Sequence, residues 1–190
     1  MKSLKDFYAA SDLPQEVLDK LFKGIKQKSI KKGTVLQSSG DEGHYSYFVR
    51  EGLLRSYTID EKGKEHVFMF APEGWVIGDI ESHTFDKPTV LYIDALEDCE
   101  IDVIDASFFN FIDELPSDAL KSQVVKLQRR VSVLQHRVLM LLSANAAERY
   151  QEFIKTYPNI TQRAPQKMIA SYLGVTPEAL SKTRGAIAKG

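Results

Sequence analysis

The chain has 190 residues, of which 43% are hydrophobic and 27% charged, and its formal net charge is −1. This length allows one sizeable core and a second small domain. Met1 to Tyr8 lacks an apolar run of the signal-peptide type, and no stretch approaches the roughly 20 apolar residues of a membrane span, so we expect no membrane contact and a cytoplasmic protein. The single cysteine, Cys99, excludes an internal disulfide framework and a four-thiolate metal site within one chain.

The first part of the chain predicts a short helix and then short strands. Ser11 to Lys23 has the pattern of an amphipathic helix that Gly24 ends. Five short apolar runs separated by turn residues follow, which is typical of an antiparallel barrel or sandwich. These runs lie around Val35, around Phe48, at Val67–Phe70, at Tyr92–Ala95 and at Ile101–Ile104. With a further helix predicted over Ser107 to Leu115 and more helices beyond it, the fold class is α+β.

A long helix with a heptad pattern comes next. Its apolar residues alternate steps of four and three, and the resulting period of 3.5 predicts the coiled-coil seam of a parallel homodimer. The seam residues are Leu120, Val124, Leu127, Val131, Leu134, Val138 and Leu141. A helix packed on the barrel would bury a similar stripe, so core packing is the alternative interpretation. Beyond the seam, Asn145 and Glu148 have capping-box spacing and begin a helix that Pro158 ends.

Residues 166–184 read Q-K-M-I-A-S-Y-L-G-V-T-P-E-A-L-S-K-T-R, which is the spacing of a helix-turn-helix. Ala170 offers a small side chain where the helices cross, and Gly174 can take the positive φ of the turn. Thr176 and Pro177 suit the N-cap and first position of the second helix. Its inward side is expected to be Leu180, Thr183 and Ile187. An ordinary pair of helices with a solvated outer face is the alternative.

The outward side of this second helix carries the predicted contacts to DNA bases. These residues are Pro177, Glu178, Ser181 and Lys182. A lysine can donate to guanine O6 or N7, a glutamate can accept from cytosine N4, a serine is permissive and a proline offers only an apolar contact.

Charge is divided unevenly along the chain. Residues 1 to 120 carry 13 Lys and Arg against 23 Asp and Glu, a net charge of −10, whereas residues 121 to 190 carry 12 against 3, a net charge of +9. A polyanion would be attracted to the C-terminal region and repelled by the rest. A basic face that is only solvated is the alternative interpretation.

Several motifs in this order resemble the Crp/Fnr family of bacterial transcription regulators along nearly the whole chain. They are K-K-G-T-V-L-Q-S-S-G-D at 31–41, Y-F-V-R-E-G-L-L-R-S-Y at 47–57, I-G-D-I at 77–80, A-L-E-D-C-E-I at 95–101, E-R-Y-Q-E-F-I-K-T-Y-P at 148–158 and P-Q-K-M-I-A-S-Y-L-G-V-T-P-E-A-L-S-K at 165–182. The last two resemble the branch of the family that is common in Bacteroidetes.

The resemblance implies a double-stranded β-roll sensor of the jelly-roll type at 1–116, a dimerisation helix at 117–143 and a helix-turn-helix domain at 144–190. It further implies a homodimer that binds a palindromic site in double-stranded DNA, with RNA polymerase as a candidate partner. Relatives carry a β-hairpin wing beside the recognition helix, but Pro158 to Pro165 is too short for one and six residues follow Arg184. We therefore expect no wing, and backbone contacts from Arg163, Lys167, Thr176, Arg184 and Lys189.

Family members that bind cyclic AMP or cyclic GMP do so with a cassette between two strands, in which a Gly-Glu pair holds the ribose and an arginine pairs with the phosphate. Here the pair is Gly78-Asp79, and Thr89 stands at the arginine position, with Lys87 and Val90 beside it. A buried phosphate would lack its planar bidentate partner, so both nucleotides are disfavoured and no cofactor is assigned.

Other function classes find less support in the sequence. His44, His66, His83 and His136 form no H-x-H pair, so a cupin-like metal site is not expected. They are candidate haem ligands in number only, because a lone histidine is more often a surface or hydrogen-bonded residue. No nucleotide loop, nucleophile elbow or Cys-His pair is present, and we expect no catalytic residue and no enzyme. The open alternatives are a cyclic-nucleotide-responsive regulator with an altered cassette, and a β-roll interaction module that does not bind DNA.

Overall fold

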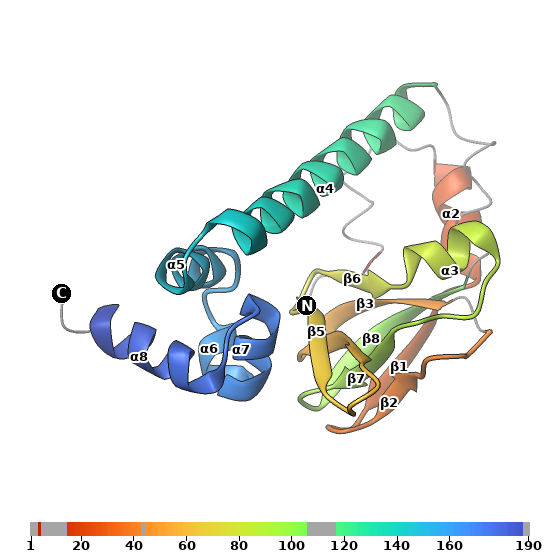
Figure 1. The fold of residues 1–190 in the computed structure, drawn as a ribbon. Helices are drawn as coiled ribbons and strands as arrows, with labels where there is room; N and C mark the ends of the chain where they lie inside the picture. Colours follow the sequence, from red (N-terminus) through yellow and green to blue (C-terminus); the bar gives the residue numbers. More distant parts are fainter. Residues whose placement is uncertain (1–3, 5–14, 43–44, 106–116, 188–190) are drawn as a thin grey trace. The chain divides into compact units, whose positions relative to one another are not determined.

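A computed structural model describes Leu4 and residues 15–42, 45–105 and 117–187 (Figure 1). The chain divides into two compact units. Unit 1 comprises Met1–Thr58 and Phe68–Val124, and unit 2 comprises Ile59–Val67 and Val125–Gly190. The helix predicted over Ser107 to Leu115 and the predicted phosphate contact Lys189 lie outside the described residues. The three-part division at residues 116 and 143 stays a prediction.

The strands form two four-stranded sheets with antiparallel pairing, and they confirm the predicted α+β class with a jelly-roll-like β-roll. The first sheet has the order β1 (Lys26–Ile30), β8 (Cys99–Asp105), β3 (Tyr45–Glu51) and β6 (Val76–Gly78). The second has the order β2 (Val35–Gln37), β7 (Tyr92–Ala95), β4 (Leu54–Ile59) and β5 (Glu65–Ala71). Of the two short helices, α2 (Gln15–Lys23) precedes β1 in the chain, and α3 (Ile80–Phe85) lies between β6 and β7.

All five apolar runs that the sequence analysis identifies become strands, namely β2, β3, β5, β7 and β8. The apolar pattern does not predict β1, β4, β6 or α3. The sequence of β1, K-Q-K-S-I, is too polar for such a signal, and four of its five residues are exposed. This strand pairs only with β8, at the edge of its sheet, where lysines discourage pairing with another chain.

The core of the roll lies on the inner faces of both sheets. Along β3, Tyr47 and Val49 face this core, while Phe48 between them packs with Leu4 and Ile104 on the other side. The main cluster consists of Tyr47, Val49, Leu54, Ala71, Ile77, Ile93, Ala95, Cys99, Ile101 and Val103. Cys99 is therefore a buried core residue. Full burial of each large aliphatic side chain is favourable by roughly 1.5–3 kcal/mol.

Five helices follow the roll in the described chain. They are α4 (Ser117–Ser143), α5 (Ala146–Thr156), α6 (Ile160–Arg163), α7 (Gln166–Leu173) and α8 (Pro177–Ile187). The predicted capping box begins α5, because the Asn145 side chain accepts from the backbone of Ala147 and Glu148 while the Glu148 carboxylate accepts from the Asn145 N–H. The segment between α5 and α7 is the single turn α6, so no β-hairpin wing lies there.

Aromatic side chains hold α5 and α7 together in unit 2. The ring of Phe153 lies 5.3 Å from those of Tyr157 and Tyr172, and Tyr157 meets Tyr172 edge-on at 5.7 Å. These are favourable arrangements for aromatic pairs. The guanidinium of Arg137, on α4, lies 4.0 Å from the centre of the Tyr172 ring, and this cation–π contact joins α4 to the same cluster.

The tip of the β4–β5 hairpin, Ile59–Val67, belongs to unit 2. The Ser171 hydroxyl, on α7, donates to the Glu65 carbonyl oxygen and accepts from the Val67 N–H, both at 2.9 Å. One hydroxyl thus satisfies two backbone groups that would otherwise need water or a neighbouring strand. Within unit 2, the hairpin tip is therefore bonded directly to the first helix of the helix-turn-helix.

Candidate nucleic-acid interface and effector cassette

The turn between α7 and α8 has the conformation that the sequence predicts. Gly174 has φ 66° and ψ 34°, and its N–H donates to the Ala170 and Ser171 carbonyl oxygens. Ala170 is buried, as a close helix crossing requires. The Thr176 hydroxyl accepts from the Ala179 N–H at 3.2 Å and so acts as the N-cap of α8, with Pro177 as its first residue.

The outer face of α8 carries the four predicted base contacts, and Pro177, Glu178, Ser181 and Lys182 are all exposed. On the inner side Leu180 is buried and Thr183 is half-buried. Ile187 does not follow the expected inward pattern, since it is 36% exposed at the last residue of α8. The sequence pattern gives the face of the helix, but it does not show how far along α8 the neighbouring helices reach.

Glu178 lies in the first turn of α8, where negative charge is favourable. Hydrogen bonds from its own backbone N–H and from the Thr176 side chain lower the pKa of the Glu178 carboxyl below its ordinary value. The carboxylate is thus held in its ionised form, which is the form that accepts hydrogen bonds.

Of the predicted phosphate contacts, Lys167 and Thr176 are exposed, and Arg163 and Arg184 are half-buried. They belong to the turn, to α8 and to the two helices before it. All four are in unit 2, together with the exposed face of α8.

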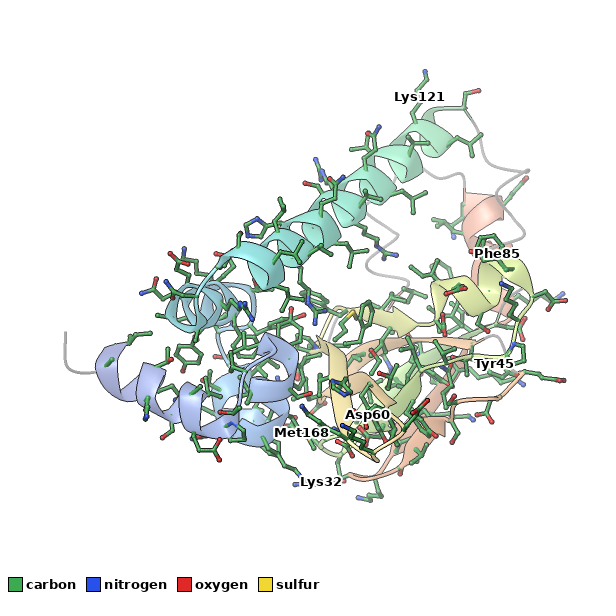
Figure 2. All side chains as sticks on the ribbon, viewed as in Figure 1. Lys32, Tyr45, Asp60, Phe85, Lys121 and Met168 are labelled. Atoms are coloured by element: carbon green, nitrogen blue, oxygen red, sulfur yellow. The ribbon has the colours of Figure 1, made fainter. Side chains whose placement is uncertain are left out.

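The predicted seam residues belong to α4 (Figure 2), and their period of 3.5 residues puts them on one side of a helix. Leu120 is half-buried, and the other six are between 38% and 57% exposed. These six residues are Val124, Leu127, Val131, Leu134, Val138 and Leu141. None of them is among the buried hydrophobic residues of the described chain.

The candidate cassette is closed by hydrogen bonds within the chain. The Asp79 carboxylate caps α3 by accepting from the Glu81 and Ser82 N–H groups at 3.0 and 3.2 Å. Its other oxygen accepts from the Thr89 hydroxyl at 2.7 Å and from the Val90 N–H at 3.2 Å. Burial raises the pKa of Asp79, but the four hydrogen bonds outweigh it and the net pKa is lowered.

The Thr89 hydroxyl has no hydrogen-bonding capacity left in this arrangement. It donates to Asp79 and accepts from the Gln37 side-chain amide at 2.8 Å and from the Leu91 N–H at 3.1 Å. Both Asp79 and Thr89 are buried. Sequence reasoning does not find Gln37 as a cassette residue, because nothing local connects it to a threonine 52 residues away.

Of the remaining cassette residues, two are exposed at the surface and one allows two strands to pack closely. The Lys87 ammonium lies 5.5 Å from the centre of the Phe85 ring and Lys87 is exposed, as is Val90. Gly78 pairs with Ser46 across β6 and β3, where an added Cβ would collide with the Ser46 side chain. The glycine is thus required for the close approach of these strands.

The described histidines bond to different partners. His66 lies 2.9 Å from Asp60, His136 lies 3.6 Å from Glu152, and His83 lies 3.4 Å from the Ser46 hydroxyl. Among the described residues, no three His, Cys, Asp or Glu side chains form a group that could hold a metal ion. No helix in the described part of the chain is long and apolar enough to cross a membrane.

The chain is similar to a known domain family and to known regulators. Residues 27–113 match the cyclic nucleotide-binding domain. The anaerobic regulatory protein of Aggregatibacter actinomycetemcomitans is 31% identical over 198 residues, which cover 93% of this chain and 73% of that protein. The fumarate and nitrate reduction regulatory protein of Yersinia pestis is 30% identical, with 93% of this chain and 75% of that protein covered. The chain belongs to the Crp/Fnr family.

Solved structures agree with this assignment at the level of the fold. FixK2 from Bradyrhizobium japonicum superimposes with a TM-score of 0.74 at 18% identity, covering 87% of this chain and 85% of that one. A Crp/Fnr family regulator from Eubacterium rectale gives 0.66 at 17% identity, covering 94% and 86%. As a Crp/Fnr protein the chain is a DNA-binding transcription regulator, and regulators of this family act as dimers.

The closed cassette of this Crp/Fnr chain predicts a pH-dependent contribution to stability. Replacing Asp79 with asparagine should lower the free energy of unfolding by about 2 kcal/mol at pH 7, because an amide nitrogen would face the Val90 N–H. Because folding lowers the pKa of Asp79, the ionised carboxylate stabilises the wild-type fold fully above the ordinary aspartate pKa of about 4. The difference in unfolding free energy between wild type and Asp79→Asn should therefore be largest there and should shrink as the pH falls. Urea unfolding of wild type and variant from pH 7 to pH 3 measures this difference in free energy, and Glu81→Gln, at an exposed position, is the control. A loss that does not change with pH would refute this role for the carboxylate.

Proposed function

We propose that this chain is a homodimeric regulator that reads a palindromic operator through the outer face of α8. The observation that carries the proposal is the exposure of Pro177, Glu178, Ser181 and Lys182 on a helix whose turn and cap are built as a helix-turn-helix requires. The excess of positive charge after residue 120 supports phosphate contact by the same region. Base contacts supply specificity, and Arg163, Lys167, Thr176, Arg184 and Lys189 position the duplex.

The exposed stripe of α4 supports the homodimer. Side chains that repeat every 3.5 residues meet their counterparts in a second α4 when the two helices supercoil. A two-fold axis between the helices gives each recognition helix an equivalent half-site, and half-sites one helical turn of DNA apart form a palindrome. An effector or partner that binds the roll would act by changing how the two α4 helices pair, provided that it binds one arrangement more tightly.

The cassette does not fit a cyclic nucleotide. The Asp79 carboxylate and the Thr89 hydroxyl are occupied by bonds within the chain, and Thr89 stands at the position where the resemblance expects the phosphate-binding arginine. The carboxylate that caps α3 would also repel a phosphate. We therefore propose an effector of another class, or none, acting on this roll.

Calorimetry tests the alternative of a cyclic-nucleotide-responsive regulator. Titration of the full chain with cyclic AMP, and separately with cyclic GMP, is expected to give no heat of binding, because a ligand would first have to break the bonds to Asp79 and Thr89. AMP serves as the control for weak, unspecific nucleotide binding. Saturable binding of a cyclic nucleotide but not of AMP would overturn our account of the cassette.

Selection from a random DNA pool tests the DNA-binding proposal, and we expect it to recover a palindrome. On that operator, Lys182→Ala should cost about 1–3 kcal/mol of binding free energy and relax the preference at one base position. Lys155→Ala, which removes an exposed lysine on α5, should leave the base preference unchanged. Unchanged affinity and preference in both Lys182→Ala and Ser181→Ala would show that other residues read the bases.

The same selection discriminates a regulator from an interaction module. A regulator's affinity should fall steeply as the salt concentration rises and should vary with DNA sequence. Failure to enrich any sequence would favour a β-roll module that associates only with proteins.

A charge in the seam should separate the dimer. Leu127→Glu places a carboxylate on the apolar stripe of each helix, and its desolvation on pairing is unfavourable, so a monomer is expected in sedimentation velocity. Ser132→Glu, at an exposed position of α4 outside the stripe, should remain a dimer. A dimer that persists in Leu127→Glu would move the interface to another surface.

A further inference from the structure

Arg149 lies near the start of α5, and its guanidinium donates three hydrogen bonds to backbone carbonyl oxygens. Its Nε donates to the Ala144 oxygen at 3.0 Å, and its Nη2 donates to the Leu141 oxygen at 2.9 Å. Its Nη1 donates to the Leu173 oxygen at 3.0 Å. The side chain is half-buried, and all of these residues belong to unit 2. One guanidinium therefore joins three points that lie up to 32 residues apart in the chain.

The three acceptors lie at the C-terminal ends of two helices. Leu141 is in the last turn of α4, Ala144 follows the end of that helix, and Leu173 is the last residue of α7. The last carbonyl groups of a helix have no partner within it and carry partial negative charge. A guanidinium between two such helix ends donates hydrogen bonds to the unpaired carbonyl groups of both. It holds the two ends at a fixed separation because its donors are rigidly arranged.

Gly174 shows how closely this joint is packed. A Cβ at this position would lie 3.4 Å from Arg149 Nη1 and 3.4 Å from Leu141 Cδ2. The last residue of the predicted seam and the guanidinium thus both touch the turn of the helix-turn-helix. Leu141, the last residue of the predicted seam, therefore contributes both its side chain and its carbonyl group to this joint.

Lysine cannot replace arginine in this joint. Its ammonium is a compact charge on a flexible stem, whereas the guanidinium presents its donors in one plane and in several directions. Three carbonyl oxygens around one planar group require that arrangement. The chemistry of the joint therefore predicts different behaviour for the two cationic residues at position 149.

We propose that Arg149 is a positioning residue that sets the place of each recognition helix relative to the α4 seam, and so the half-site spacing that the dimer accepts. This inference rests on the proposed reading of a palindrome by a homodimer. Contact with one half-site needs only a folded helix-turn-helix. Contact with two half-sites at once also needs both recognition helices at the right separation, because that separation must match the turn of the DNA.

The test uses the full chain with Arg149→Lys and Arg149→Gln, and Arg129→Lys as the control on an exposed position of α4. Affinity is measured for the selected palindrome, for the palindrome lengthened or shortened by one base pair at its centre, and for a single half-site. Both Arg149 variants should lose about tenfold on the selected palindrome. They should keep their affinity for the half-site within about twofold and bind the three spacings almost equally. Arg129→Lys should retain the wild-type spacing preference.

An unchanged spacing preference in both Arg149 variants would overturn the proposal. An equal loss on palindrome and half-site, with a lowered melting temperature, would also overturn it, because Arg149 would then serve only the folding of unit 2. Recovery of no palindrome by the wild-type chain would instead count against the proposed function.

A distance measurement tests the joint without DNA. Spin labels at Ala186→Cys on α8, in a Cys99→Ser background, report the separation between the two recognition helices of a dimer. Arg149→Lys should broaden the distribution of distances relative to wild type, while the dimer persists in sedimentation. Identical distributions would show that Arg149 does not set the position of α8.

Discussion

The unburied apolar stripe of α4 is the constraint on which the rest of the proposed mechanism depends. A helix of 27 residues that leaves the valine and leucine side chains of this stripe about half-exposed gains only part of the roughly 1.5–3 kcal/mol that full burial of each side chain would contribute. In the proposed dimer, pairing with a second α4 would add the remainder. The two-fold symmetry of such a pair then decides that there are two recognition helices and two half-sites. Reading two half-sites also requires a fixed distance between the two helix-turn-helix domains, which symmetry alone does not set. In our proposal Arg149 sets this distance.

The cassette illustrates how a binding fold can be stabilised without its ligand. In the short helix α3, the N-terminal N–H groups require a negative partner, and Asp79 supplies it from within the chain. Thr89 and Gln37 complete the set, because the Thr89 hydroxyl donates to Asp79 and accepts from the Gln37 side-chain amide. A ligand must compete with these bonds rather than find free donors and acceptors. Input to the roll is therefore better sought on its outer surfaces than in this cassette.

Features that depend on neighbouring residues could be predicted from the sequence. Gly174, the Thr176 cap and the Asn145 capping box each require only a few consecutive residues. The heptad stripe on α4 stays a prediction. Contacts between distant segments could not be predicted. Gln37 meets Thr89 and Arg149 meets Leu173 only after the chain has folded, and the polar strand β1 forms because β8 offers it an edge. The periodicity of a sequence predicts one helix or strand at a time, whereas these contacts depend on how two elements are placed against each other.

Glu178 has a further consequence for the way DNA is searched. A carboxylate that hydrogen bonds keep ionised stands on the proposed reading face, one helical turn before Lys182. On DNA of the wrong sequence it has no base donor to accept from, while it still repels the phosphates on both sides of the groove. Such a charge weakens all complexes slightly and mismatched ones most, so that discrimination arises from repulsion as well as attraction. If Glu178 lies in the groove as proposed, this repulsion would speed the release of the regulator from unsuitable sites.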